Sequence, residues 1–348
     1  MTQARGRSCT TIPADVVREV SARAPARIDF GGGWTDVPPY DVEQGGCVCN
    51  LAISRHATVR IASCPGEVRV EDDGGSAWAD TADDLPREGV TALAAAALRR
   101  ARVGDVRVTT RSHFPSGAGL GGSSAAGVAM AGALAAWRGE HPDRAELAEL
   151  SRAVEVEELG VAGGRQDHYA AAFGGALGLR FEDRVHVRRI PVSDELIAAL
   201  ERQCIVGYTG RTRISGETIT AVLDAYAARD AGVVAALRRM RELAEQMIDA
   251  LDAESLDTLG ALVAEHWAHQ RRLHPRITTP EIDALLDAAL AAGALGGKAL
   301  GASGGGCVVV IAPDDGVVPV RATVARHAAL VPFMVDRAGL TTSLHEDA

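Results

Sequence analysis

One stretch of the sequence combines glycines and hydroxyl groups in a pattern suited to holding a phosphate. Residues 115–126 read PSGAGLGGSSAA, and an Ala- and Met-containing segment over 127–137 follows with the composition of a helix. Glycines let the backbone approach a ligand, and a helix start directs unpaired N–H groups and a positive dipole end at the loop. Ser123 and Ser124 fall in the expected first turn, where a hydroxyl can cap the helix, bond phosphate or ligate a metal. The stretch therefore indicates an anion site.

The stretch differs from two familiar phosphate-binding motifs. No Lys follows its last glycine, as a Walker A loop requires, and it does not follow the first strand, as a Rossmann fingerprint does. A linker or a tight strand-to-helix turn has the same composition, so the run alone leaves that alternative open. A kinase site also needs a metal carboxylate, a group near the acceptor hydroxyl and stabilisation of the transferred phosphoryl group.

Glu155 is the first candidate for the metal carboxylate. It lies on a helix expected over residues 143–159, and Glu157 and Glu158 compete with it for the role. An acidic residue on a helix usually belongs only to a solvated face, which is the alternative for all three.

Asp167 is the candidate for the group near the acceptor. It follows the glycine pair 163–164 among small and apolar residues, and a loop could bring it beside Glu155. Its alternative role is to cap the segment 168–173. His168 is expected to be a packed or surface side chain and not a catalyst, as an isolated histidine usually is.

The elements that must position these groups follow from hydrophobic patterning. An alternating strand over 20–30 ends at Gly31-Gly32-Gly33, and a polar loop over 34–40 carries Asp36. A domain boundary is expected near residue 195. The remaining expected elements are strands at 45–53, 57–62, 67–70 and 105–111, a helix at 89–101, a hairpin of 176–181 with 185–190, a strand at 204–208, helices within 215–290, a strand at 307–312, and a final helix and strand.

Composition narrows the class of protein. The 348 residues carry a net charge of -10, with 47% hydrophobic residues, as in an ordinary globular protein. That charge argues against nucleic acid as a partner. The N-terminus lacks the apolar core of a signal peptide, and no run approaches a membrane span, so a cytoplasmic monomer or homodimer is expected. The six cysteines show no metal-binding spacing and are expected to be reduced, with Cys47 and Cys49 on one face of a strand.

Three motifs in this order resemble those of the GHMP kinase superfamily, the galactokinase, homoserine kinase and mevalonate kinase group. They are APAR at 24–27 with Gly32 and Thr35-Asp36, the stretch 115–126, and GASGGG at 301–306. Within the superfamily the chain resembles anomeric sugar kinases of the D-glycero-D-manno-heptose 7-phosphate kinase and L-fucose kinase type. That likeness is carried by residues 32–40 with 45–46, 164–175, 208–210 and 296–298. Ser303 stands where those kinases usually have Gly, and Gly122 where many have Ser.

The resemblance implies an α+β fold of two domains with the site between them. Residues 1–195 would form an ATP-binding domain of the ribosomal protein S5 domain 2-like type, and residues 196–348 a ferredoxin-like domain. Mg²⁺ would be held by Ser124 and Glu155. Asp167 would act as general base or electrostatic guide, with Arg27 near it or near the transferred phosphate. ATP binding is implied for Pro115, Gly117, Ala118, Gly119, Leu120, Gly121, Gly122, Ser123 and Ser124.

The resemblance also implies an acceptor site, formed by Gly32, Gly33, Thr35, Asp36, Gln166, Tyr208, Gly304 and Gly305; the last two could instead support the phosphate loop. The leading expectation is an ATP- and Mg²⁺-dependent kinase that phosphorylates the anomeric hydroxyl of D-glycero-D-manno-heptose 7-phosphate for nucleotide-sugar synthesis. Cations that could grip the distal phosphate are Arg165, Arg211, Arg213, Arg271, Arg272 and Lys298.

Alternatives are an L-fucose 1-kinase and an octose 8-phosphate 1-kinase of an antibiotic pathway. From another class, the same fold hosts diphosphomevalonate decarboxylase and non-catalytic regulators. A regulator should have lost its carboxylate or serines, whereas Asp167, Glu155, Ser123 and Ser124 are all present here. The sequence therefore favours an enzyme.

Overall fold

The larger of two sheets has eight strands. The computed structural model describes residues 17–115, 117–161, 163–210 and 216–347. The sheet runs in the order β12-β1-β2-β5-β3-β4, and β6 with β7 extends it from another part of β2. Its strands are β1 (Val17–Gly31), β2 (Gly46–Ser63), β3 (Val68–Asp72), β4 (Gly75–Ala79), β5 (Val106–Ser112), β6 (Ala176–Phe181), β7 (Val185–Ile190) and β12 (Thr341–Asp347).

The long strand β2 joins two parts of this sheet. Its first half pairs with β6 and its second half with β5, while β1 runs antiparallel along both halves. Two strands were expected here, at 45–53 and 57–62, and that prediction is wrong. The break in the pattern marks the point where β2 changes partners, and β1 shifts register opposite it, between Pro25 and Ala26. No turn interrupts the strand.

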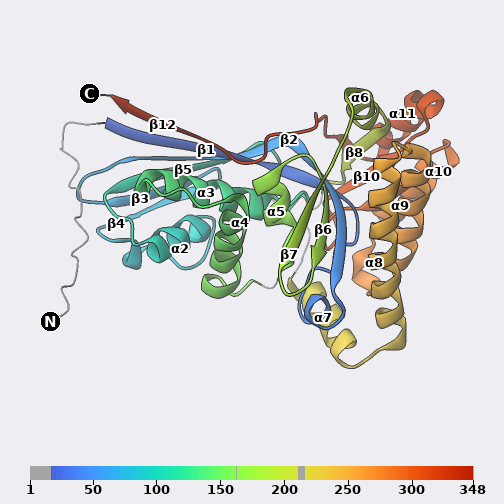
Figure 1. Ribbon diagram of the computed structural model, residues 1–348, viewed down its shortest axis with the longest axis horizontal. Coiled ribbons are helices and arrows are strands. Elements are labelled where there is room, and N and C mark those ends of the chain that lie inside the picture. The colour runs from blue at the N-terminus through green and yellow to red at the C-terminus, as the bar shows by residue number, and fades with distance from the viewer. Residues whose placement is uncertain (1–16, 116, 162, 211–215, 348) are drawn as a thin grey trace.

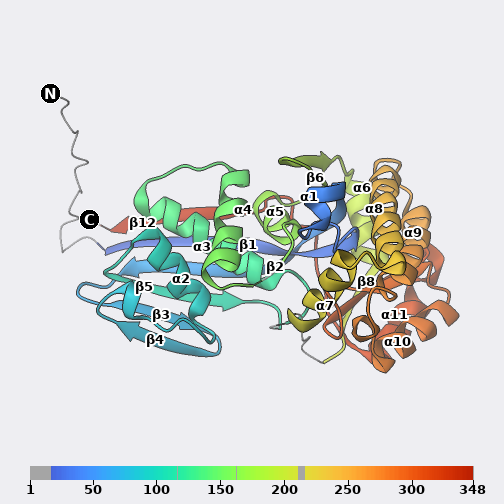
Figure 2. The same cartoon turned by 90° about the horizontal axis from the view of Figure 1, so that it is seen from below.

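Helices cover one face of the large sheet. They are α2 (Ala92–Ala101), α3 (Gly122–Arg138), α4 (Arg144–Ala153) and α5 (Gln166–Phe173). Figure 2 shows α2, α3 and α4 lying together over β1, β2 and β5. Ten of the 17 residues of α3 are alanine or glycine, which lets this helix lie close to the strands. Its buried face belongs to a core with Val59, Ile61 and Val108.

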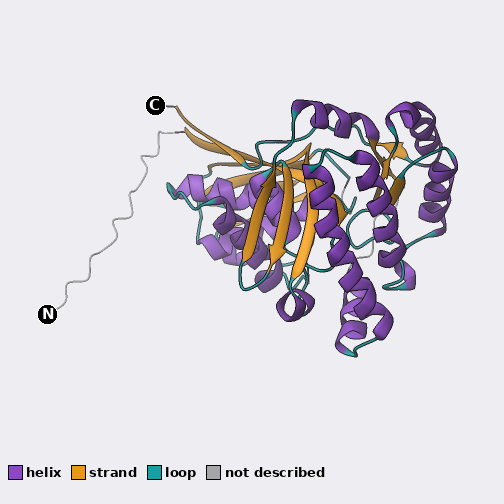
Figure 3. Ribbon diagram, turned by 45° about the vertical axis from the view of Figure 1, so that its right-hand side comes forward, coloured by secondary structure: helices purple, strands orange, loops and turns teal. Residues whose placement is uncertain are grey.

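The smaller sheet has four antiparallel strands in the order β11-β8-β10-β9. These are β8 (Cys204–Tyr208), β9 (Gly296–Ala299), β10 (Cys307–Ile311) and β11 (Ala329–Leu330). Helices pack around it (Figure 3). Those that pack directly on its strands are α6 (Asp194–Gln203), α9 (Leu256–Gln270), α10 (Pro280–Ala291) and α11 (Val317–His327). The long helix α8 (Ala231–Asp252) packs against β1 and β2 of the larger sheet and against α9, and α7 (Gly216–Ala227) packs against α8. A short α1 (Tyr40–Gln44) follows β1.

The two halves of the molecule, one built around each sheet, share one apolar core. It contains Ile28 of β1 and Leu51 of β2 together with Val206, Leu243 and Val309 of the second half. The last strand, β12, returns from the second half to pair with β1, at the end of the molecule away from α8 and α9 (Figure 1). The division expected at residue 195 stays a prediction. Although β12 lies after that residue in the sequence, it pairs with β1 in the larger sheet.

Several expected elements are present with changed bounds. The hairpin of 176–190 is confirmed, and Cys47 and Cys49 both lie buried on β2, as expected. The helix expected from residue 127 begins at Gly122, because the last residues of the glycine-rich stretch are helical. The helix expected over 143–159 ends at Ala153 and continues as a π-helical turn, Val154–Glu158. Within the described residues, none of the helices has the length and hydropathy that a membrane crossing requires.

Candidate active site

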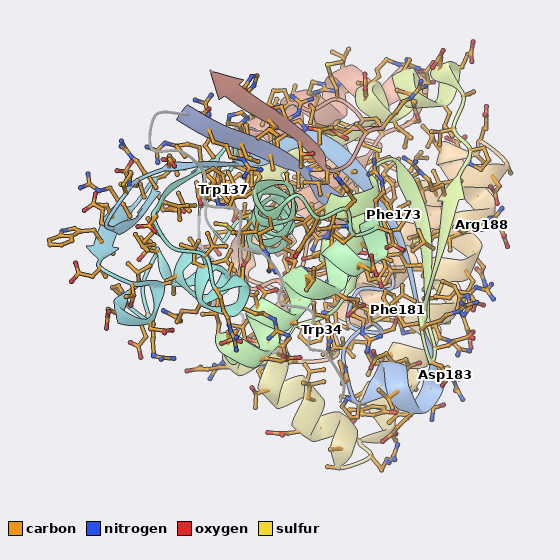
Figure 4. The ribbon with its side chains drawn as sticks, turned by 60° about the vertical axis from the view of Figure 1, so that its left-hand side comes forward. Trp34, Trp137, Phe173, Phe181, Asp183 and Arg188 are labelled. Carbon is orange, nitrogen blue, oxygen red and sulfur yellow. The ribbon has the colours of Figure 1, made fainter. Side chains whose placement is uncertain are left out.

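A cavity of about 330 Å³ lies where the two halves meet. The first half contributes residues of β1, the loop after it, the glycine-rich loop and the start of α5. The second half contributes Ile219 of α7 together with Gly301 and Ala302. Trp34, labelled in Figure 4, lies just after β1 and lines the same cavity. Eleven of the twenty catalytic, nucleotide, acceptor and metal residues that the sequence singled out line this cavity.

The glycine-rich loop is held from behind by hydrogen bonds. The Arg27 guanidinium donates to the Gly119 carbonyl at 2.6 Å, and the Cys307 N–H donates to the Ala118 carbonyl at 2.7 Å. Gly119 has φ +79°, and a Cβ there would lie 2.6 Å from the Leu300 carbonyl oxygen. Only glycine suits that position. The loop is thereby fixed between the two halves.

The start of α3 leaves its first amide groups without a capping side chain. Gly121 precedes the helix with φ +73°, and no side chain caps the helix. The first N–H groups of a helix have no partner within it, so these donors and the dipole favour an anion. Ser123 and Ser124 lie in the first turn and line the cavity. This geometry suits a triphosphate.

Arg27 and Asp167 form a bidentate ion pair beside this loop. Arg27 Nε donates to Asp167 Oδ1 at 2.7 Å and Nη2 donates to Oδ2 at 3.0 Å. Arg27 is 2% exposed and Asp167 is 20% exposed, so the carboxylate is the more accessible partner, and both residues line the cavity. Asp167 is the second residue of α5, which Arg165 precedes, and so it does not cap the helix. The capping alternative is wrong.

Glu155 lies beside the two serines, on the π-helical turn. Its Oε1 accepts from the Ser123 hydroxyl at 2.9 Å, and its Oε2 lies 3.5 Å from the Ser124 hydroxyl oxygen and 3.0 Å from His168 Nε2. Burial works against the ionised form, but the His168 contact and both hydroxyls outweigh it and hold the pKa of Glu155 below its usual range. A π-helical turn is rare and often marks a functional site.

The two competing acids lie elsewhere. Glu157 and Glu158 both accept from Arg100, at 2.8 and 3.1 Å, and neither lines the cavity. Glu155 instead contacts both serines of α3 and lines the cavity. Among the three acids, the geometry selects Glu155.

The Ser124 and Glu155 oxygens suit a magnesium ion. Mg²⁺ takes oxygen ligands and usually keeps several waters and phosphate oxygens, so one carboxylate and one hydroxyl are enough. Among the described residues no group of three or more acidic, histidine or cysteine side chains could hold a metal alone. An ionised carboxylate beside a hydroxyl at the phosphate loop fits an ion that arrives with a nucleotide.

On the other side of the cavity, Asp36 is almost completely buried. Its Oδ2 accepts from the Gln166 N–H at 2.9 Å, and a Cβ on Gly164 would lie 2.0 Å from that oxygen. Burial raises the pKa of Asp36 to about 7; the bond from Gln166 opposes this rise and the charge of Asp167 adds to it. Asp36 therefore changes its charge near neutral pH.

We expect Asp36→Asn to stabilise the protein at alkaline pH. In wild type the folded state keeps a proton on Asp36 up to about pH 7, whereas the unfolded state loses it near the ordinary value of 3.8. Wild-type unfolding free energy therefore falls between these two pH values, and the full penalty persists above the upper one. The Asn variant should gain about 4 kcal/mol at pH 8 and nothing at pH 3.

Urea unfolding of both proteins at pH 3, 5 and 8 measures this difference. Asn keeps an oxygen that can accept from the Gln166 N–H, so packing is preserved. Parallel stability profiles for the two proteins across this pH range would contradict the burial argument. A lower affinity of the variant for the acceptor at pH 8 would, in addition, support the role in acceptor binding that the resemblance assigns to Asp36.

Among the described residues that line the cavity, three buried polar atoms have no hydrogen-bond partner within the part of the chain that the structure describes. They are Asp29 Oδ1, Trp34 Nε1 and Gln166 Oε1. An unpaired buried polar atom costs about 1–3 kcal/mol, so natural sites rarely keep one without a use. The sequence singled out Gln166 but missed Asp29 and Trp34. Asp29 could have been found, because it lies two residues after Arg27 on an alternating strand and so shares its face.

Lys298 does not serve the role that the sequence suggested. Its ammonium group is fully buried and donates to Asp29 Oδ2 at 2.8 Å and to the Asp29 carbonyl at 3.0 Å. It therefore cannot grip a distal phosphate in this arrangement. Arg271 lies 3.3 Å from Asp283, and neither Arg165, Arg271 nor Arg272 lines the cavity. Arg211 and Arg213 lie outside the described residues.

Several expected acceptor residues support the site from behind. The Thr35 hydroxyl donates to the Gly32 carbonyl at 2.7 Å and accepts from the Cys47 N–H at 3.1 Å, so it is not free for a ligand. The Gly32 N–H donates to His266 Nε2 at 2.8 Å, and Tyr208 pairs within the second sheet. Gly33 does line the cavity. The expected residues that do not line it are Gly32, Thr35, Tyr208, Gly304, Gly305, Pro115, Ala118, Gly119 and Leu120.

The third glycine run meets the cavity with its first residues. Gly301 and Ala302 line it, whereas a Cβ on Gly306 would lie 2.6 Å from the Ala118 carbonyl oxygen. Gly306 therefore packs against the phosphate loop, which agrees with the supporting role left open for this run. Ser303, where glycine was the usual residue, has φ +75°, a conformation that favours glycine.

Comparison with known proteins decides the family. A model of the GHMP kinases N terminal domain matches residues 89–175, and one of the GHMP kinases C terminal domain matches residues 247–328. The mevalonate kinase of Pyrococcus horikoshii is 33% identical over 247 residues, which cover 69% of each chain. The chain belongs to the GHMP kinase family. Its two-domain α+β fold is the fold of GHMP kinases, as the resemblance implied.

Other proteins that are similar to this chain are named as sugar kinases. The D-glycero-alpha-D-manno-heptose 7-phosphate kinase of Campylobacter jejuni is 26% identical over 302 residues, 83% of this chain and 88% of that one. A bifunctional fucokinase/GDP-fucose pyrophosphorylase of Arabidopsis thaliana is 26% identical over 85% of this chain, which spans only 30% of that protein. A solved D-glycero-D-manno-heptose 1-phosphate kinase from Bacteroides thetaiotaomicron has the same fold, with TM-score 0.77 and 24% identity over 93% of this chain and 98% of the other.

Proposed function

We propose that this chain is an ATP- and Mg²⁺-dependent kinase that phosphorylates the anomeric hydroxyl of a sugar. The observation that carries the proposal is the convergence of three groups on one cavity: the helix start after the glycine-rich loop, the Ser124–Glu155 pair and the Arg27–Asp167 pair. These are the parts that phosphoryl transfer needs, because its catalysis is mainly positioning and charge stabilisation. The named sugar kinases among its relatives support a sugar as the acceptor.

Each group of the chain has a role in this proposal. The N–H groups at the start of α3 hold the triphosphate, and Ser124 and Glu155 hold Mg²⁺. When bound, the ion neutralises charge on the phosphate oxygens. Asp167 accepts or orients the proton of the acceptor hydroxyl, and a loose transition state needs little assistance from a base. Arg27 fixes Asp167 and the loop together, since it bonds both.

D-glycero-D-manno-heptose 7-phosphate is the first acceptor that we propose. The heptose 7-phosphate kinase of Campylobacter jejuni, which aligns over most of both chains, supports it. The product would be a 1,7-bisphosphate for nucleotide-sugar synthesis. An octose 8-phosphate is a close variant of the same proposal.

L-fucose is the second candidate, and one observation favours it. Lys298 is neutralised by Asp29, and the only described cation that lines the cavity, Arg27, is paired with Asp167. A neutral sugar needs no further cation. A fucokinase among the relatives supports the same acceptor.

An ADP-release assay with Mg²⁺ and ATP tests the proposal. The acceptors are heptose 7-phosphate, octose 8-phosphate, L-fucose, galactose, homoserine and mevalonate, with NMR of the product to locate the phosphate. We expect turnover of a sugar at C1 and none of mevalonate or homoserine. Turnover of L-fucose alone would replace the first acceptor with the second. Turnover of mevalonate alone, or ATP binding without any turnover, would contradict a sugar 1-kinase.

A further inference from the structure

His168 is a buried histidine at the junction of three elements near the cavity. It lies on α5 next to Asp167 and is 1% exposed. Its Nδ1 lies 2.9 Å from the Ser151 hydroxyl oxygen of α4, and its Nε2 lies 3.0 Å from Glu155 Oε2 on the π-helical turn. The expectation that it is a packed side chain holds, but its partners lead directly to the proposed metal ligands.

The partners define what each ring nitrogen does. A carboxylate can only accept, so the His168 Nε2–H donates to Glu155. Nδ1 faces the Ser151 hydroxyl, which can donate or accept, so the ring is held at both ends. Ser124 Oγ also lies 3.4 Å from Nε2, a weaker contact than that of Glu155. The ring is therefore fixed in position by contacts at both of its nitrogens.

The neighbouring helix makes room for this chain of bonds. Gly127 lies inside α3, where glycine costs about 1 kcal/mol relative to alanine. A Cβ at Gly127 would lie 2.3 Å from the Ser151 hydroxyl oxygen. A glycine is thus needed there for Ser151 to reach His168. Gly127 of α3, Ser151 of α4 and His168 of α5 thus form a packed series that ends at the Glu155 carboxylate.

We propose that His168 is a positioning residue that aims the Glu155 carboxylate at Ser124, and so sets the affinity for the divalent cation that accompanies ATP. This inference rests on the proposed function. Glu155 Oε2 is 3.5 Å from the Ser124 oxygen but 3.0 Å from His168 Nε2, so the imidazole and not the serine fixes that oxygen. Partners behind a metal ligand typically change metal affinity by about 10–100-fold when they are removed.

His168→Leu and His168→Gln test this inference as a pair. Leu removes the donor, whereas Gln can still donate to Glu155. We expect Mn²⁺ binding, measured by electron paramagnetic resonance in the presence of a non-hydrolysable ATP analogue, to weaken about 10–100-fold in His168→Leu. His168→Gln should recover most of that loss. The Mg²⁺ concentration for half-maximal kinase rate should move in parallel, and the KM for the acceptor should not.

Ser151→Ala and His56→Gln are the matched comparisons. Ser151→Ala releases the far end of the ring and should weaken Mn²⁺ binding by a smaller factor. His56 is also largely buried, at 12% exposed, and its Nε2 lies 2.7 Å from a carboxylate oxygen of Asp336, outside the cavity. His56→Gln should therefore leave Mn²⁺ binding unchanged. A general effect of losing a buried histidine would appear in both histidine positions.

The outcomes separate the inference from the function. Wild-type Mn²⁺ affinity in folded His168→Leu overturns the inference. If that variant does not fold, Ser151→Ala decides: unchanged affinity overturns the inference, and weaker affinity supports it. If wild-type protein itself binds no cation with the nucleotide, the proposed function fails whatever the variants do.

Discussion

Replacement of Asp167 by Asn is expected to lower kcat about 10³-fold and to leave nucleotide affinity within a few-fold of wild type. Asn has the size of Asp but carries no charge, so it can neither accept the acceptor proton nor orient it through an ionic contact. It also keeps an oxygen for one bond from Arg27, which preserves the attachment of Arg27 to the Gly119 carbonyl. The phosphate loop should therefore stay in place.

ADP release under saturating substrates, with calorimetric binding of an ATP analogue, separates the two effects. Glu157→Gln is the matched control, because Glu157 is an exposed acid that bonds only Arg100 among the described side chains. Its kcat should stay within twofold of wild type. Near-normal turnover in Asp167→Asn would contradict the role of Asp167, and equal loss of nucleotide binding would mean that the variant had damaged the loop instead.

Local patterning was sufficient for the elements whose signals are local. The hairpin of 176–190 follows from two alternating runs around a polar turn, and the structure has it. The continuous strand β2 was read as two, because its pattern changes where its neighbour changes from β6 to β5. The pairing of β12 with β1 joins residues more than three hundred positions apart, and alternation within a strand carries no information about such a partner.

The candidate site shows the same division. The glycine-rich loop is one contiguous run of sequence. The helix that begins after it could be predicted from the sequence, and so could Glu155 and Asp167 as candidates. What a side chain is already bonded to could not. The Thr35 hydroxyl is bonded to backbone groups. His168 contacts Glu155 and Ser151, and the residues around His168 in the sequence do not reveal those contacts. A resemblance gives a residue its place, but only the fold gives its partners.

Lys298 is the clearest failure of residue type as a guide to role. A lysine is rarely buried without a partner, so its residue type favours contact with a distal phosphate, as the sequence predicts. Its partner, Asp29, lies 269 residues earlier, on the other sheet. Both side chains are almost fully buried, and burial lowers the pKa of Lys298 despite the opposing charge of Asp29. For Asp29, burial is outweighed by the charges of Lys298 and Arg27, which hold its pKa below the usual range.

Lys298→Met is expected to lower the free energy of unfolding by about 3–5 kcal/mol. Met fills most of the space of the lysine stem but leaves the Asp29 carboxylate buried without its partner. Urea unfolding at pH 7 measures the loss. Arg202→Met is the comparison, because Arg202 and Asp314 form an ion pair that is half exposed or more, and such pairs contribute at most about 1 kcal/mol.

The double variant Lys298→Met with Asp29→Asn decides what the pair contributes. With both charges removed, no uncompensated ion stays buried, so much of the stability should return. The KM for the acceptor should not return to the wild-type value in the double variant, because Asp29 lines the cavity. Gly301 and Ala302, which follow Lys298 in the sequence, line it as well. A double variant as unstable as Lys298→Met would mean that packing, not charge, caused the loss. If stability and acceptor KM both returned to wild type, the pair would serve only to join the two sheets.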